Sequence, residues 1–159
     1  MDGTLDEVGG EFVLRFVRRL SYSVETVWSA VTEPATLDRW LAATEIDLVP
    51  GGQITMRFAN TGIVNRGEIT AIDPPRLLAH TWDSQGAAHG HLRWELSRDP
   101  EGCQLVLVHA LAERDHVAMI AAGWHGHLDM LELVLAHLPA HWSWRRWEEL
   151  RAAYTVRFG

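Results

Sequence analysis

The residues of this chain best suited to acid–base or metal chemistry are its nine histidines. His127 falls within the segment 123–138, whose apolar residues recur at the spacing of an α-helix. The residues that share one stripe of that helix are Trp124, His127, Leu128, Leu131, Val134, Leu135 and Leu138. His125, Asp129 and Glu132 are expected to project away from the stripe. His127 is therefore predicted to be the only polar side chain on the buried face of this helix.

A neutral imidazole can act as a general acid or base near physiological pH. If the chain is an enzyme, such as a cyclase, dehydratase or hydrolase, we expect His127 to be catalytic, with His80 or His109 across the cavity. The alternative is a hydrogen-bonded core histidine, which is the commoner situation for a lone inward imidazole. No nucleophile elbow, Cys–His signature or phosphate-binding glycine loop accompanies the histidines. The sequence thus favours a binding protein and leaves an enzyme open.

The histidine spacing does not predict a metal site. His89 and His91 would share one face of a strand, whereas His125 and His127 would be about 200° apart around a helix. The chain has no H-E-x-x-H motif, and no carboxylate at a matching interval completes a ligand set. We therefore expect neither a bound metal nor a cofactor.

Eight tryptophans, against four phenylalanines and two tyrosines, are the strongest signal for the chemistry of a ligand. Each indole offers a flat apolar surface and one N–H donor, which suits a planar or ring-containing molecule. Trp82, Trp94 and Trp124 lie in elements expected to face a cavity, and Trp40 lies where two short helices would close it. Trp28 is expected to pack in the core. The tail residues Trp142, Trp144 and Trp147 are expected to attach the tail to the body or to a second subunit.

The elements that must position these side chains begin with a strand and two helices. Alternating apolar residues predict a strand over 11–20. Ser23 is a candidate N-cap for a short helix, and Pro34 is suited to the first turn of a second one that ends at about Leu41. This order places two short helices directly after the first strand.

The rest of the chain reads as a meander followed by a long helix. Six strand candidates between residues 43 and 110 are separated by turn-forming sequences such as Pro50-Gly51-Gly52, and strands this close are expected to be antiparallel. In one of them Met56 and Phe58 share the apolar face. A long helix is predicted over about 115–138 and a shorter one over about 143–154. An antiparallel sheet with one dry face would then curl around the long helix.

Composition excludes several classes of function. The 159 residues are 47% apolar and 22% charged, as in one ordinary globular domain, and the formal net charge is −7. We see no apolar run of about 18 residues and no basic-then-apolar leader, so we expect no membrane span and a cytoplasmic protein. The basic clusters are Arg15, Arg18 and Arg19, expected on the solvent face of a strand, and Arg145 with Arg146. Both are too short to predict nucleic-acid binding.

Four segments, taken together and in this order, carry a resemblance to a known family: VWSAVTEPATLDRWL at 27–41, PGG at 50–52, GEITAIDPPRLLAHTW at 67–82 and GWHGHLDMLELVL at 123–135. Together they resemble the AHSA1-like branch of the SRPBCC superfamily, also called START or Bet v 1-like. The closing HWSWRRWEELRAAY resembles the tail of bacterial members. The resemblance implies the helix-grip fold, with a cavity that in many relatives binds an apolar small molecule. It does not imply activation of Hsp90, because the eukaryotic activators carry an additional domain that engages the chaperone.

We therefore predict an α+β helix-grip protein in which six to seven antiparallel strands wrap around the long C-terminal helix. Residues 1–10 would be a flexible N-terminus and 11–159 a single AHSA1-like domain, with 139–159 packing on it as a C-terminal extension. The predicted function is binding of an apolar or aromatic small molecule, at Trp40, Met56, Phe58, Trp82, Trp94, Trp124, His127, Leu128 and Leu131. The alternatives are an enzyme acting in the same cavity and a protein-interaction or co-chaperone-like module. A homodimer would follow if the tail packs on a second subunit.

Overall fold

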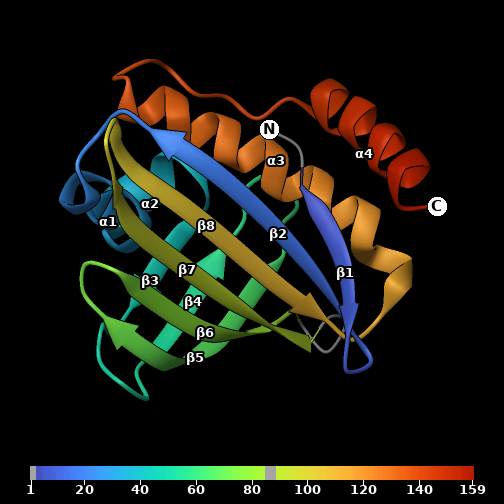
Figure 1. The fold of residues 1–159 in the computed structure, drawn as a ribbon, viewed down its shortest axis with the longest axis horizontal. Helices are drawn as coiled ribbons and strands as arrows, with labels where there is room; N and C mark the ends of the chain where they lie inside the picture. Colours follow the sequence, from blue (N-terminus) through green and yellow to red (C-terminus); the bar gives the residue numbers. More distant parts are fainter. Residues whose placement is uncertain (1–2, 85–88) are drawn as a thin grey trace.

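A curved antiparallel sheet and a long helix form the two layers of the molecule (Figure 1). The computed structural model describes residues 3–84 and 89–159. Within them the strands are β1 (Thr4–Val8), β2 (Glu11–Leu20), β3 (Ala43–Ile46), β4 (Gln53–Arg57), β5 (Val64–Asp73), β6 (Leu77–Asp83), β7 (His89–Asp99) and β8 (Gly102–Leu111). The helices are α1 (Val24–Thr32), α2 (Pro34–Trp40), the short 3₁₀ turn η1 (Arg114–His116), α3 (Val117–Leu135) and α4 (Trp144–Phe158). The predicted α+β helix-grip fold is confirmed.

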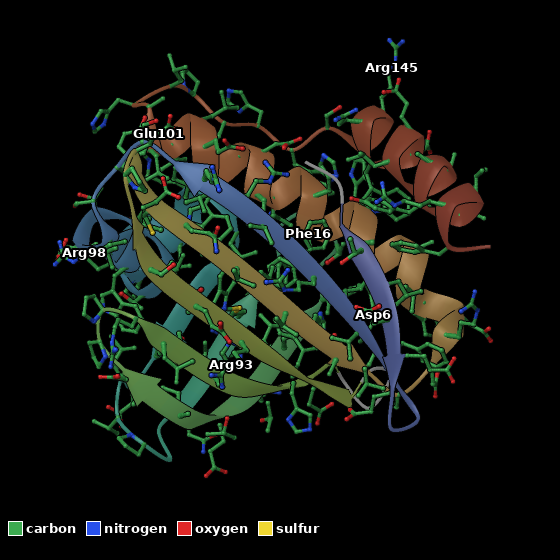
Figure 2. The ribbon with its side chains drawn as sticks, viewed as in Figure 1. Asp6, Phe16, Arg93, Arg98, Glu101 and Arg145 are labelled. Carbon is green, nitrogen blue, oxygen red and sulfur yellow. The ribbon has the colours of Figure 1, made fainter. Side chains whose placement is uncertain are left out.

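The described strands form one sheet in the order β1-β2-β8-β7-β6-β5-β4-β3. Strands from β3 to β8 follow one another as a meander, and β2 pairs with β8 through residues 12–20. The turn between β3 and β4 depends on Gly52, because a Cβ there would lie 2.0 Å from the carbonyl oxygen of Asp47. The sheet curls so that its inner face covers α3, while Arg93 lies among its outer side chains (Figure 2).

Local sequence signals account for the helix boundaries. The Ser23 hydroxyl oxygen accepts a hydrogen bond from the Thr26 N–H at 3.1 Å, which caps α1 as predicted. Pro34 occupies the first turn of α2, where its missing N–H is not needed. The helix α3 ends at Leu135, and His137 takes a left-handed backbone with φ of 58°. Leu138, predicted to lie on the buried stripe, is therefore beyond the helix and half exposed.

The N-terminus differs from the expected flexible end. Residues 4–8 form β1, which pairs with β2 from Thr4↔Arg15 to Val8↔Glu11, whereas residues 1–2 lie outside the described residues. The tight reversal at Gly9 and Gly10 uses positive φ values of 59° and 83°, which glycine adopts without strain. Because β1 is mostly exposed, its hydrophobic pattern is weak. This strand raises the count to eight in the described chain, above the six to seven predicted.

Two predicted surface residues are buried instead. His125 is only 5% exposed, because α4 and β2 cover the side of α3 that the sequence alone leaves to solvent. Arg18 lies on the inner face of β2, where its Nη1 donates to Asp129 at 2.9 Å and to Glu132. Because Arg18 is two residues from Phe16, it shares the inner face of the strand with that residue, and its expected position on the solvent face was wrong. A buried guanidinium is tolerated here because two carboxylates of α3 pair with it.

A chain of polar contacts attaches α4 to α3 and to the N-terminus. The Tyr154 hydroxyl accepts a hydrogen bond from the Gly3 N–H at 2.7 Å and lies 2.7 Å from Nδ1 of His125. Nε2 of His125 is 3.8 Å from Asp129, the same carboxylate that pairs with Arg18. Arg145, at the start of α4, extends away from the body (Figure 2). The C-terminal helix is thus fixed through its buried face and leaves its charged face to solvent.

Candidate functional site

A cavity of about 480 Å³ lies between the inner face of the sheet, α3 and the C-terminal segment, residues 139–159. Its apolar wall consists of Leu41, Phe58, Ile63, Trp82, Met119, Ile120, Gly123, Trp124, Trp142, Trp144 and Trp147. Its polar wall consists of Asn60, Thr61, Asn65, Ser84, His109, His116 and His127. No Asp, Glu, Lys or Arg side chain occurs among these lining residues. The volume and the apolar character are those of a small-molecule site.

Five indoles dominate the wall and contact one another. The ring centroids of Trp82 and Trp124 are 5.6 Å apart. In the C-terminal segment, the ring centroids of Trp142 and Trp144 are 5.5 Å apart, and those of Trp144 and Trp147 are 5.4 Å apart. These tilted and edge-to-face arrangements are favourable for aromatic pairs. Two groups of indoles, one on the sheet and α3 and the other on the tail, therefore offer broad apolar faces to the same space.

His127 presents a defined face to this cavity. Its Nδ1 lies 2.8 Å from the backbone oxygen of Trp40, and since a carbonyl only accepts, Nδ1 must donate. Burial lowers the pKa of His127 from 6.5 to about 4, against the opposing effect of this hydrogen bond. The imidazole is thus neutral at pH 7, with its lone pair at Nε2. The Trp142 ring stacks on it with centroids 4.5 Å apart.

His109 has the opposite tautomer. The indole N–H of Trp124 donates to Nδ1 of His109 at 2.9 Å, so the neutral ring carries its proton at Nε2. Burial, and then the neighbouring His80 and His91, lower the pKa of His109 to about 3. Nε2 is buried without a hydrogen-bond partner among the described residues. His109 is therefore a neutral hydrogen-bond donor in the cavity wall.

His80 lies deeper in the sheet than the cavity. Its Nδ1 is 2.9 Å from the backbone oxygen of Thr81 and must donate to it, while Nε2 is buried and has no partner in the described part of the chain. Burial lowers the pKa of His80, opposed by the bond to Thr81. The Trp82 ring is a neighbour of both His80 and His109, with centroids 6.3 Å and 5.4 Å away. His80 is not among the residues that line the cavity.

The predicted site residues divide into a wall and a core. Phe58, Trp82, Trp124 and His127 lie on the cavity wall, as does His109. The remaining predicted contacts do not line it and are core residues less than 4% exposed: Trp40, Met56, Trp94, Leu128 and Leu131. Trp40, for example, donates its indole N–H to the Ala30 oxygen at 2.8 Å and packs edge-on against Trp94.

The sequence interpretation did not place the tail tryptophans at the site. Trp142, Trp144 and Trp147 were expected only to attach the tail, yet all three line the cavity. Trp142 reaches His127 across Gly126, where a Cβ would lie 3.1 Å from the indole. Three tryptophans within six residues, next to a glycine on the facing helix, are the signal that could have indicated this contact. Asn60 and Asn65 were also missed, because they lie in loop and strand positions with no motif.

Metal chemistry finds no support in the side chains that the structure describes. No group of three or more His, Cys, Asp or Glu residues in 3–84 and 90–159 could hold a metal ion. The side chain of His89 lies outside the described residues, so its pairing with His91 stays a prediction.

Comparison with known proteins identifies the family. Residues 21–136 match the family model described as "Activator of Hsp90 ATPase homolog 1-like protein". The chain belongs to this AHSA1 family. The resemblance inferred from the four sequence segments is thereby confirmed. Among curated proteins, none matches the chain.

Several solved structures share the AHSA1-like fold. The crystal structure of CalU16 from Micromonospora echinospora is 24% identical, with a TM-score of 0.76 and coverage of 98% of this chain and 96% of that one. A protein encoded by gene BPP1335 of Bordetella parapertussis is 29% identical, with a TM-score of 0.74 and coverage of 91% and 85%. DynU16, from the dynemicin biosynthetic locus, is 22% identical, with a TM-score of 0.74, and the match covers 82% of this chain and 49% of that one. Among the described helices of the present chain, none is long and apolar enough to cross a membrane.

Proposed function

We propose that the chain binds an apolar or aromatic small molecule in the cavity between the sheet, α3 and the C-terminal segment. The observation that carries this proposal is the space of about 480 Å³ walled by five indoles and Phe58. Burial of a ring against such walls is favourable by about 25 cal/mol per Å² of apolar surface removed from water. The proposal is also supported by DynU16, a protein of this fold from a biosynthetic locus.

The lining argues against a strongly charged ligand. Its described residues contain no carboxylate, guanidinium or ammonium group, and two of its three histidines are neutral at pH 7. An ion moved into such surroundings loses its hydration without gaining a counter-charge. We therefore expect an uncharged probe to bind in preference to an anionic one.

The test uses N-phenyl-1-naphthylamine, an uncharged two-ring fluorophore that brightens in apolar surroundings. Gly123 lines the cavity, and a Cβ at this position would meet nothing within 4 Å, so a larger side chain there would extend into the open space. Gly123→Phe is expected to weaken binding about tenfold or more by filling that space, whereas Gly123→Ala serves as the matched control. Saturation at one probe per chain supports the proposal. Absence of saturable binding, or equal affinity of both variants, would overturn it.

The identity of the natural ligand is addressed by native mass spectrometry of freshly purified protein. A copurified mass that is lost on mild heating, and that is absent from the Gly123→Phe variant, would identify the molecule held in this cavity. The same mass in both proteins would place that molecule elsewhere.

Acid–base catalysis on the bound molecule is the second candidate function, and one observation supports it. His127 donates through Nδ1 to a backbone carbonyl and leaves the lone pair of Nε2 on the cavity wall, which is the arrangement of a general base. Its low pKa makes it a weak base at pH 7. Incubation of the protein with ring compounds that bind in the cavity, followed by their recovery unaltered, would count against acid–base catalysis on them.

We also propose a location in the cytoplasm and a test for assembly as a homodimer. One buried free cysteine, Cys103, suits the reducing cytoplasm that we propose for this chain. A homodimer through exposed apolar residues of the C-terminal segment, such as Trp144, is tested by the mass in solution measured by light scattering. A monomeric mass at all concentrations would remove the dimer from consideration.

A further inference from the structure

The cavity wall carries a small number of polar atoms without partners, and their chemistry restricts the ligand. Nε2 of His127 makes no hydrogen bond with a described residue. Asn60 Oδ1, His109 Nε2 and Trp142 Nε1 are buried and unpartnered within the described chain. Buried polar atoms are normally paired, so unpaired ones gathered around one space point to a group that enters it.

His127 is the best-defined of these groups because its protonation is fixed by geometry. The carbonyl of Trp40 can only accept, so the ring proton is at Nδ1 and the lone pair is at Nε2. Phe58 lies at a centroid distance of 5.8 Å on one side, and Trp142 stacks at 4.5 Å. These rings hold the imidazole in place, so its lone pair is a fixed hydrogen-bond acceptor within an aromatic wall.

His109 cannot serve as a second acceptor. Its Nδ1 already accepts from the Trp124 indole, and its remaining nitrogen carries a proton. His116, the other lining histidine, is 44% exposed at its side chain and lies near Glu113, at 3.7 Å. The wall therefore offers a ring compound one oriented imidazole acceptor, at His127.

We propose that the ligand of this cavity is an uncharged aromatic ring compound with a hydroxyl or N–H group that donates a hydrogen bond to Nε2 of His127. This inference rests on the proposed function and adds the chemical class of the ligand to it. The indoles bind the ring through its faces, and His127 selects the polar substituent. A carboxylate at the same position is disfavoured, because it would oppose the imidazole lone pair and finds no cation among the described lining residues.

Three probes with the same two-ring body test the class of ligand. They are 2-naphthol, which donates at pH 7, 2-methoxynaphthalene, which cannot donate, and 2-naphthoate, which is an anion. We expect 2-naphthol to bind about tenfold more tightly than 2-methoxynaphthalene, as one buried hydrogen bond provides, and 2-naphthoate to bind most weakly. Binding is measured by isothermal titration calorimetry on the full chain.

Two variants assign the preference to one residue. His127→Phe keeps a ring between Phe58 and Trp142 but removes the acceptor, so the affinities for 2-naphthol and 2-methoxynaphthalene should become equal. His141→Phe, the same change at an exposed histidine that is not among the lining residues, should keep the tenfold preference. In the unaltered protein, the ¹⁵N resonance of His127 Nε2 should shift on addition of 2-naphthol and not of 2-methoxynaphthalene, and this readout holds even if His127→Phe does not fold.

The outcomes separate this inference from the proposed function. Equal affinities for 2-naphthol and 2-methoxynaphthalene in the unaltered protein, or tightest binding of 2-naphthoate, would overturn the assignment to a donor-bearing uncharged ring while leaving the cavity as a binding site. Absence of one-to-one binding for all three probes would overturn both. A preference that survives in folded His127→Phe would reject His127 as the acceptor.

Discussion

Acidification should destabilise this protein steeply, because two histidines at the cavity are held neutral by burial. In the folded chain the pKa of His109 is about 3 and that of His127 about 4, both below the ordinary value of 6.5. Above pH 6.5 neither ring binds a proton in either state, so neither contributes to pH dependence. Below pH 6.5 the unfolded chain takes up a proton at each histidine, whereas the folded chain does not until the pH reaches about 4 or below. The free energy of unfolding therefore falls as the pH falls from 6.5.

The magnitude follows from the displacement of each pKa. Between the unfolded and the folded pKa, each pH unit lowers the free energy of unfolding by about 1.4 kcal/mol per histidine. At pH 5, about 1.5 units below the unfolded pKa of 6.5, each histidine has therefore lowered it by about 2 kcal/mol. Together His109 and His127 should lower the free energy of unfolding by about 4 kcal/mol between pH 8 and pH 5. That is a large share of the roughly 5–15 kcal/mol by which a typical domain is stable. His80, whose pKa burial also lowers, acts in the same direction.

The assay is urea denaturation followed by circular dichroism at pH 8, 7, 6 and 5. His127→Gln, which can still donate to the Trp40 oxygen, should reduce the loss between pH 8 and pH 5 by about 2 kcal/mol relative to the unaltered chain. Gln53→Ala changes an exposed side chain that does not titrate and should reproduce the unaltered profile. A profile flat to within about 1 kcal/mol, or one that His127→Gln leaves unchanged, would refute the assignment of neutral buried imidazoles.

Three further tests, with five substitutions, address the packing of α3, the buried ion pair of Arg18 and the cavity wall. Gly123→Ala should stabilise α3 by about 1 kcal/mol, because alanine has the higher helix propensity. Gly126→Ala should not stabilise the helix, because its Cβ would lie 3.1 Å from the Trp142 ring. Equal stability of the two variants in urea denaturation would contradict this contact. Arg18→Ala should lower the free energy of unfolding by about 2 kcal/mol or more, because it breaks a buried ion pair. Arg57→Ala, in an exposed pair, should lower it by less than about 1 kcal/mol. Similar losses for both variants in thermal unfolding would show that the burial of Arg18 is unimportant. Trp142→Ala opens the wall beside the imidazole and should weaken N-phenyl-1-naphthylamine binding about tenfold, so unchanged affinity would exclude this indole from the site.

The sequence predicted the fold well because its signals there are local. The alternation in 11–20 reproduces β2 to the residue, and the Ser23 hydroxyl caps α1 as expected. Errors arose where a second layer covers a surface. His125 lies off the apolar stripe of α3, and the positions of α4 and of Phe16 in β2 decide that it is buried. Periodicity assigns a side chain to a face of its own element and does not show what packs against that face.

The site was predicted in part, for a related reason. The sequence placed Trp82, Trp94 and Trp124 on inner faces, and all three are there, but only Trp82 and Trp124 reach the cavity. Trp94 lies underneath, in edge-on contact with Trp124 at 5.6 Å. The depth of an inward side chain depends on the curvature of the sheet and on the sizes of its neighbours, which a single sequence does not encode locally. Trp142 joins the cavity wall from the segment that follows α3, where it stacks on His127. Its position depends on the path of that segment, which the sequence does not show.

The contacts among the indoles make the cavity its own optical reporter. Five of the eight tryptophans border it, and successive ring centroids within each group are 5.4–5.6 Å apart. At such separations the electronic transitions of neighbouring indoles couple, so the near-ultraviolet spectrum of the chain records their mutual orientation. A bound ring that turns one indole would alter this coupling without any attached label. The residues that form the wall thus also allow its occupancy to be observed in the unmodified protein.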